Sequence, residues 1–354
     1  MNEACVYYNE RHPWIDVAKG IGIICIFIGH LTYWGTPISK FVFSFHLSLF
    51  FFLSGVLFNV GKHADFKQFY FAVLRKYFVA YFFFLILGMF ALPFRINITD
   101  LNVMKLLWST FYLGHPMPNG PLWFLVSLCG VETIYWMWCR FFTFKRGDVV
   151  LCLIAFACTF VVTYSLSLAP QIRKFIPFKL ETLPVAMIFF SCGRLFARKL
   201  LADFVISVRA RLLWCACIFW IMCVISRYAN PSCLQGSQIH DLWFFILSFT
   251  GITAVVLFAK SFNLQVLRGW VMYIGRNSLV FFAMEFVTMP VLLWLGRLFY
   301  DPCMVFYPLN HRIPLAYSMV LLLLQVLSIG IIVKPITFLL VSCQNACGVN
   351  RCLH

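Results

Sequence analysis

Residues 11–35, RHPWIDVAKGIGIICIFIGHLTYWG, contain a long apolar run that follows a short polar and charged stretch. A helix needs about 20 predominantly apolar residues to cross a bilayer, and this run is long enough. Residues 1–16 are polar and carry acids, and no small-residue cleavage site follows the run. We therefore expect a retained membrane helix rather than a cleaved signal peptide.

The rest of the chain repeats this apolar pattern. Of its 354 residues, 62% are hydrophobic and 11% are charged, whereas soluble domains carry about 25% charged residues. The 42 Phe and 11 Trp suit lipid-facing surfaces and membrane interfaces. We predict an all-α fold, a polytopic transmembrane helical bundle that forms one transmembrane domain over residues 1–354.

About ten membrane spans are expected, because each needs about 20 apolar residues. They lie near residues 17–36, 41–60, 70–92, 121–140, 149–168, 181–197, 211–228, 241–260, 270–291 and 314–338. Residues 100–114 could add a short re-entrant or interfacial helix.

The distribution of positive charge predicts the orientation of the bundle. Lys and Arg total 28 against 12 Asp and Glu, which gives a net charge of +16. With both termini in the cytoplasm, about two thirds of the basic residues fall on the inner side, as the positive-inside rule requires. The inner segments 62–76 and 194–211 are the most basic. This bias accounts for most of the excess charge, so no nucleic-acid partner is expected.

Three ionisable residues of the first helix, Asp16, Lys19 and His30, are the most informative polar groups. At about 100° per residue they share one face, with Lys19 and His30 about 16 Å apart along the axis. Ionisable groups are costly in a membrane and are candidates for function. Such a face could hold an anionic ligand at one end and transfer a proton at the other. The structural alternative is an interfacial lysine paired with Asp16, and a histidine that serves packing.

The second predicted span, FVFSFHLSLFFFLSGVLF, adds a second histidine within the membrane. His46 lies in its outer half, and Ser54 and Gly55 lie near its inner end. Small residues allow close helix packing, which is the structural alternative for Ser54 and Gly55. His46 could serve either chemistry or packing.

The fourth and ninth predicted spans carry the remaining polar candidates. Trp123 begins the fourth span and is expected at interface depth, as an anchor or a site residue. Glu132 lies in mid-span with no basic residue within one turn, so it must pair across helices or be protonated. In the ninth, Asn277 and Ser278 lie near the inner end and Glu285 follows inside an apolar run, where a purely structural role is the alternative.

Taken in order, these segments resemble the acyltransferase-3 family of bacterial integral-membrane acyltransferases. The matching motifs are Lys19-x10-His30 preceded by Asp16, His46 running into Phe50-Phe51-Phe52-Leu53-Ser54-Gly55, Pro121-Leu122-Trp123-Phe124-Leu125 with Glu132 downstream, and Gly275 to Leu279. One position departs from the family pattern, because many members have a histidine seven residues after the serine of the last motif. This chain has Glu285 there.

The resemblance implies an O-acyltransferase of the bacterial inner membrane. Its donor would be a cytoplasmic acyl-CoA, most often acetyl-CoA, and its acceptor a hydroxyl of a sugar in a surface polysaccharide, such as a fucose-type sugar, or in a lipid-linked glycan. Membrane lipids are the remaining partners. The residues assigned to catalysis are His30, His46 and Glu132, and those assigned to donor binding are Asp16, Lys19, Ser54, Trp123, Asn277 and Ser278.

In this reading, His30 is the general base on the acceptor hydroxyl, or briefly carries the acyl group. His46 orients the thioester or the acceptor, while Asp16 and Glu132 set tautomer or charge. The 93–120 and 291–313 segments are the candidates to contact the acceptor. The 15 Cys include no C-x-x-C pair, and the cluster of Cys343, Cys347 and Cys352 lacks metal-site spacing with His, so no metal is expected.

A second function fits the same residues. A proton-coupled transporter or flippase for a sugar or glycolipid could use His30 and the carboxylates as a proton relay. Against it, no internal repeat of the transporter kind is evident in the sequence. A non-catalytic scaffold fits poorly with two histidines and two acids within the spans.

Overall fold

The structure is a computed structural model and describes residues 11–31, 37–63, 65–94, 102–113, 118–142, 147–201, 207–228, 242–262, 265–296 and 315–346. Within these ranges every regular element is helical. The α-helices are α2 (Pro13–Leu31), α3 (Pro37–Phe43), α4 (His46–Leu57), α5 (Phe66–Ala91), α6 (Val103–Leu107), α7 (Trp123–Phe141), α8 (Gly147–Leu168), α9 (Leu183–Leu201), α10 (Val208–Tyr228), α11 (Leu242–Ser261), α12 (Gln265–Arg276), α13 (Ser278–Gly296) and α14 (Leu315–Ala346).

The expected polytopic helical bundle is confirmed. Among the described residues, 9 helical segments are long and apolar enough to cross a membrane. They correspond to every predicted span except the seventh. That span coincides with α10, whose 21 residues give a length of about 31 Å, enough to cross a hydrocarbon core of about 30 Å.

The ninth predicted span, at 270–291, is not one continuous helix. The chain breaks at Asn277, so that α12 ends at Arg276 and α13 begins at Ser278. The Asn277 side-chain amide donates to the carbonyl of Tyr273 at 2.8 Å. A short polar side chain that bonds its own backbone competes with helix continuation, and the crossing segment is therefore shifted to Ser278–Leu295.

The second predicted span is also interrupted, between α3 and α4. The break frees backbone carbonyls that a buried segment must satisfy. The imidazole of His46 bonds the Val42 carbonyl, and the Ser248 hydroxyl of α11 donates to the Ser44 carbonyl. The short helix expected at 100–114 is present as α6 followed by the π-helical turn η4 (Trp108–Tyr112).

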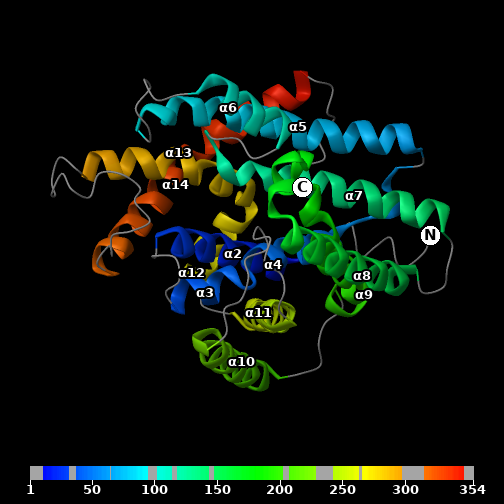
Figure 1. Cartoon of the computed structure of the whole chain (residues 1–354). Helices are drawn as coiled ribbons and strands as arrows, with labels where there is room; N and C mark the ends of the chain where they lie inside the picture. The colour runs from blue at the N-terminus through cyan, green and yellow to red at the C-terminus, as the bar shows by residue number, and fades with distance from the viewer. Residues whose placement is uncertain are drawn as a thin grey trace.

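Helix α2 lies inside the bundle rather than at its edge. It contacts α4, α11, α12, α13 and α14. Figure 1 shows α2 and α4 in the middle, with α10 and α11 on one side and α5, α13 and α14 on the other. This central position brings the ionisable residues of α2 next to side chains from distant parts of the sequence.

Glycines allow the tightest helix contacts in this core. A Cβ added to Gly55 of α4 would lie 2.0 Å from the Phe190 carbonyl oxygen of α9. Reciprocally, a Cβ on Gly193 of α9 would lie 2.0 Å from the Phe52 carbonyl oxygen. The packing role expected for Gly55 is therefore confirmed, since only a residue without a side chain permits this approach.

Candidate active site

His30 lies one residue before the end of α2 and contacts a carboxylate from α13. Its ring atom Nδ1 is 2.6 Å from Glu285 Oε1. The His30 side chain is 18% exposed, whereas that of Glu285 is 1% exposed. The rings of Phe43 and Phe286 pack against the imidazole. The side chain is thus held by one ionisable partner and two aromatic rings.

His46, the first residue of α4, lies close to His30. Its Nδ1 is 2.8 Å from the Val42 carbonyl oxygen, and because a carbonyl only accepts, Nδ1 carries the hydrogen. The Phe43 ring contacts both imidazoles, at centroid distances of 5.7 Å from His30 and 5.2 Å from His46. The structure therefore brings the two predicted histidines together around one phenylalanine.

Asp16 is 8% exposed at the opposite end of α2. Its Oδ2 accepts from Arg11 Nε at 3.1 Å and from Arg276 Nε at 3.3 Å. Its ion pairs are thus with two arginines, and the Arg276 contact joins α2 to α12. Because these two arginines balance the negative charge of the Asp16 carboxylate, that charge is not available to Lys19 alone.

Lys19 lies one turn from Asp16 and is partly buried. In the described part of the chain its ammonium makes no hydrogen bond or ion pair. The charges that act on it are those of Asp16, Lys76 and Arg11. A partly buried cation without a direct counter-charge is well suited to an anionic ligand.

Two apolar residues separate Lys19 from His30 along their shared face of α2. Ile23 and Ile26 are each 1% exposed and packed in the core. Since the two polar groups are about 16 Å apart, a ligand that reaches both must be long. It must also run beside these isoleucines rather than through them.

Glu132 of α7 lies in a separate cluster with α5. Its Oε1 accepts from the Tyr77 hydroxyl at 2.6 Å and from Lys76 Nζ at 3.4 Å. Glu132 is 6% exposed. The structure places this acid with Tyr77 and Lys76 rather than with either histidine. Because the Lys76 charge also acts on Lys19, the cluster faces the donor-binding end of the predicted site.

The chain matches a known protein family over most of its length. A family model described as an acyltransferase domain, that of acyltransferase-3, matches residues 12–341, nearly the whole chain. The chain belongs to the acyltransferase-3 family. No curated protein and no solved structure shows a significant similarity to it. The molecule is thus a multi-pass membrane protein and a membrane acyltransferase.

The α12–α13 junction of this acyltransferase lies beside Asp16 and Lys19. A Cβ on Gly275 would lie 1.7 Å from the Asp16 carbonyl oxygen and 2.8 Å from the Gly20 nitrogen. Asn277 and Ser278 follow directly at the break. Four residues assigned to donor binding, Asp16, Lys19, Asn277 and Ser278, therefore gather at one end of α2.

The other two residues assigned to donor binding lie on α4 and α7. Ser54 is partly exposed beside Gly55. Trp123 is 3% exposed, so it packs within the protein instead of anchoring at an exposed interface. The rings of Phe51 and Phe124, 4.8 Å apart, show that the two helices pack together.

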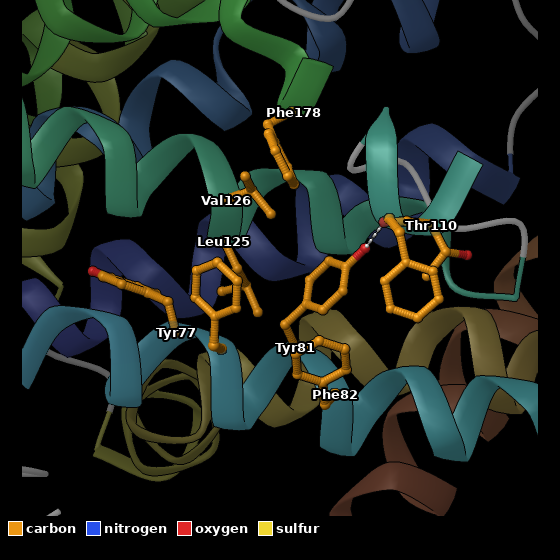
Figure 2. A pocket seen from close by; sticks show the side chains of 9 residues that line it. Tyr77, Tyr81, Phe82, Thr110, Leu125, Val126 and Phe178 are labelled. Atoms are coloured by element: carbon orange, nitrogen blue, oxygen red, sulfur yellow. Dashed lines mark hydrogen bonds between the residues drawn. The ribbon is translucent and has the colours of Figure 1, made fainter. Parts of the chain in front are cut away.

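A small apolar pocket adjoins the Glu132 cluster. It has a volume of about 140 Å³ and is lined by Tyr77, Phe78, Tyr81, Phe82, Thr110, Phe111, Leu125, Val126 and Phe178. Figure 2 shows the Tyr81 hydroxyl donating to the Thr110 carbonyl, at 2.9 Å. The Tyr77 hydroxyl is taken by Glu132, so the walls of this acyltransferase pocket are mainly carbon and suit hydrocarbon better than sugar.

Some predictions for the acyltransferase fall outside the described residues. These include residues 95–101 and 114–117 of the segment considered for acceptor contact, and residues 297–313 of the other. Among the described residues, no group of three or more His, Cys, Asp or Glu side chains could hold a metal ion.

Sequence reasoning missed the partners of the site histidine and of Glu132. Glu285 is predicted from the sequence as an acid inside an apolar run and as a departure from the family pattern, but its contact with His30 joins residues 255 positions apart. Tyr77 is not singled out by the sequence, and Lys76 is noted there only as part of the basic inner segment 62–76. The one available signal was that Glu132 and Glu285, as intramembrane acids, each needed a partner on another helix.

Proposed function

We propose that this acyltransferase moves an acetyl group from cytoplasmic acetyl-CoA to a hydroxyl of a sugar, in a surface polysaccharide or lipid-linked glycan at a bacterial inner membrane. One observation carries the proposal. Helix α2 presents at one end the ammonium of Lys19, which has no direct counter-charge among the described residues, and at the other the imidazole of His30, held by a carboxylate. The first group suits an anionic donor, and the second suits proton transfer from a hydroxyl.

The donor-binding end of the site is rich in positive charge. The positive charges of Lys19 and Lys76 interact there electrostatically. Arg11 and Arg276 flank the carboxylate of Asp16. Coenzyme A carries several phosphate charges, and a positively charged region raises the local concentration of such a ligand. Its long pantetheine arm separates the phosphates from the thioester, which matches a site whose two ends are about 16 Å apart.

The chemical step needs a base at the acceptor hydroxyl. Acetyl-CoA supplies an activated carbonyl carbon. His30 takes the hydroxyl proton through Nε2 as the oxygen attacks that carbon, and it returns the proton to the departing thiolate sulfur. A positioned base of this kind contributes roughly 10²- to 10⁴-fold to a rate. No proton is gained or lost overall, so His30 ends the cycle as it began.

His46 and Glu132 have supporting roles in this proposal. His46 has its Nδ1 committed to the Val42 carbonyl, which leaves Nε2 to orient the acceptor or the thioester. Glu132 fixes Lys76 and Tyr77, and it thereby shapes the charge around Lys19. We expect loss of Glu132 to weaken donor binding more than it slows proton transfer.

Acetyl-CoA carrying a radiolabelled acetyl group tests the function. Membranes containing the protein are incubated with it and with glycan or glycolipid extracted from the source bacterium. The proposal predicts label in the glycan, removable by mild alkali as expected for an ester. Movement of the glycolipid across the membrane with no labelled glycan would instead favour a flippase and would contradict the proposal.

A further inference from the structure

The residue at position 285 sets this chain apart from the histidine-containing family pattern. We propose that Glu285 is a positioning residue for the reaction, which fixes His30 in the tautomer whose Nε2 is the base and balances the charge that forms on the imidazole. The inference rests on the proposed function. The observation behind it is the contact between His30 and Glu285 inside the membrane domain.

Hydrogen-bond chemistry assigns the two ring nitrogens different roles. His30 Nδ1 lies 2.6 Å from Glu285 Oε1, and an ionised carboxylate only accepts. Nδ1–H therefore donates to Glu285, and Nε2 of the neutral ring keeps its lone pair. The carboxylate thus selects the tautomer that can accept a proton from a hydroxyl.

The backbone around Glu285 is held firmly by other buried groups. Gln325 Nε2 of α14 donates to the Glu285 carbonyl at 3.3 Å. Asn119 Nδ2 donates to the Ala283 carbonyl at 2.9 Å. Gln325 and Asn119 are each 0% exposed. Helix α13 is thereby held at Glu285 and two residues before it, which is what a positioning residue needs.

The Glu285 carboxylate is only partly satisfied by its contacts. Glu285 Oε2 is buried and has no hydrogen-bond partner in the described part of the chain. A buried carboxylate is costly unless a positive charge lies beside it. The imidazolium that forms when His30 takes a proton supplies that charge. The pairing is therefore strongest as the reaction proceeds, when it accelerates the step.

The other charged or titratable groups around α2 do not replace Glu285. From α4, His46 lies near His30, and its Nδ1 is committed to the Val42 carbonyl. From α3, Lys40 lies one turn before Phe43. From α11 and α12, Lys260 lies over Trp14 and Arg276 pairs with Asp16, both at the far end of α2. From α14, Gln325 is uncharged.

The transfer step balances with Glu285 ionised throughout. A bond forms between the acceptor oxygen and the carbonyl carbon, and the bond from that carbon to sulfur breaks. The hydroxyl proton passes to His30 Nε2 and then to the sulfur. Glu285 keeps the Nδ1 hydrogen bond and transfers no proton itself.

Substitutions at position 285 test the proposal by kinetics. Glu285→Gln keeps the shape and removes the charge, so we expect kcat to fall roughly 10²- to 10³-fold, with little change in KM for acetyl-CoA. Glu285→His, which restores the family residue, should recover part of kcat.

A matched control lies one turn further along α13. Thr288 Oγ1 bonds the Met284 carbonyl of its own helix, at 3.0 Å, and Thr288→Val should leave kcat and KM for acetyl-CoA unchanged. A Glu285→Gln enzyme whose kcat matches the wild type would overturn the proposal. So would a Thr288→Val enzyme with the same kinetic defect.

A spectroscopic measurement tests the contact without relying on activity. The protein is labelled with ¹⁵N-histidine in lipid nanodiscs, and the His30 signals are assigned by their loss in His30→Ala. We expect the hydrogen on Nδ1 in the wild type and a mixture of tautomers in Glu285→Gln. A hydrogen on Nε2 in the neutral wild type would overturn the proposal. Absence of acetyl transfer by the wild type would refute the proposed function and leave this measurement interpretable.

Discussion

Gly275 packs its α-carbon directly on the backbone carbonyl of Asp16, so closely that an added Cβ would lie 1.7 Å from the oxygen. This contact sets α12 against α2 and brings Arg276 to the Asp16 carboxylate. The donor-binding end of the site therefore depends on a backbone-to-backbone contact that side-chain movement cannot relieve.

Gly275→Ala should consequently destabilise the protein. Overpacking costs typically 1–3 kcal/mol, and more where the neighbour is backbone, so we expect a clearly lower melting temperature in detergent. Gly269→Ala on the same helix is the control, because a Cβ there meets no atom within 4 Å. Equal melting temperatures for the two variants would contradict the packing described for Gly275.

Lys19→Met should weaken donor binding. A hydrogen bond to a charged group contributes about 1.5–3 kcal/mol, so KM for acetyl-CoA should rise roughly 10- to 100-fold while kcat falls less. Lys19→Arg should retain most of the affinity, since it keeps the charge. Lys105→Met, on α6, removes an exposed lysine and serves as the control. If KM rises as much in Lys105→Met, Lys19 has no special role.

The contact between Tyr77 and Glu132 predicts a difference between two tyrosines of α5. Tyr77→Phe leaves a buried carboxylate with one donor fewer, which costs roughly 1–3 kcal/mol or more. Tyr81→Phe removes a bond to a neutral backbone carbonyl, that of Thr110, and should cost less. Thermal melts of both variants check this order, and a larger loss in Tyr81→Phe would contradict it.

The charge bias predicts that both termini and the most basic segments face the cytoplasm. Fusions of alkaline phosphatase and of green fluorescent protein after Gln171 and after Lys199 place reporters in the loop between α8 and α9 and near the C-terminal end of α9. We expect phosphatase activity only from the Gln171 fusion and fluorescence only from the Lys199 fusion. The reverse pattern would invert the membrane orientation and remove the cytoplasmic donor from the Lys19 side.

The helices of this fold were predictable because membrane spans are encoded locally. The first span, expected near 17–36, corresponds to α2, which runs from Pro13 to Leu31, and its 3.6-residue period places Lys19 and His30 on one face. The break at Asn277 was harder to predict, since it depends on a side-chain bond to Tyr273 and on the packing of Gly275. A polar cluster within an apolar run was the signal for it.

The partners of the site could not be derived in this way. Which helix faces His30 depends on how distant segments pack, and nothing in the sequence near position 30 identifies α13 as the neighbour. Likewise, Glu132 clearly needed a partner, but only the packing of α7 on α5 selects Tyr77. Local patterns identified residues that need partners, and tertiary structure determined which residues those are.

The central claim is that His30 is the base that transfers the acetyl group, and one measurement tests it most directly. Initial rates of acetyl transfer from labelled acetyl-CoA are compared for wild type, His30→Ala and Cys25→Ser, a control on the same helix, at equal protein levels in membranes. The account predicts a loss of at least about 10²-fold in His30→Ala and near wild-type rates in Cys25→Ser. Near wild-type transfer by His30→Ala would contradict it.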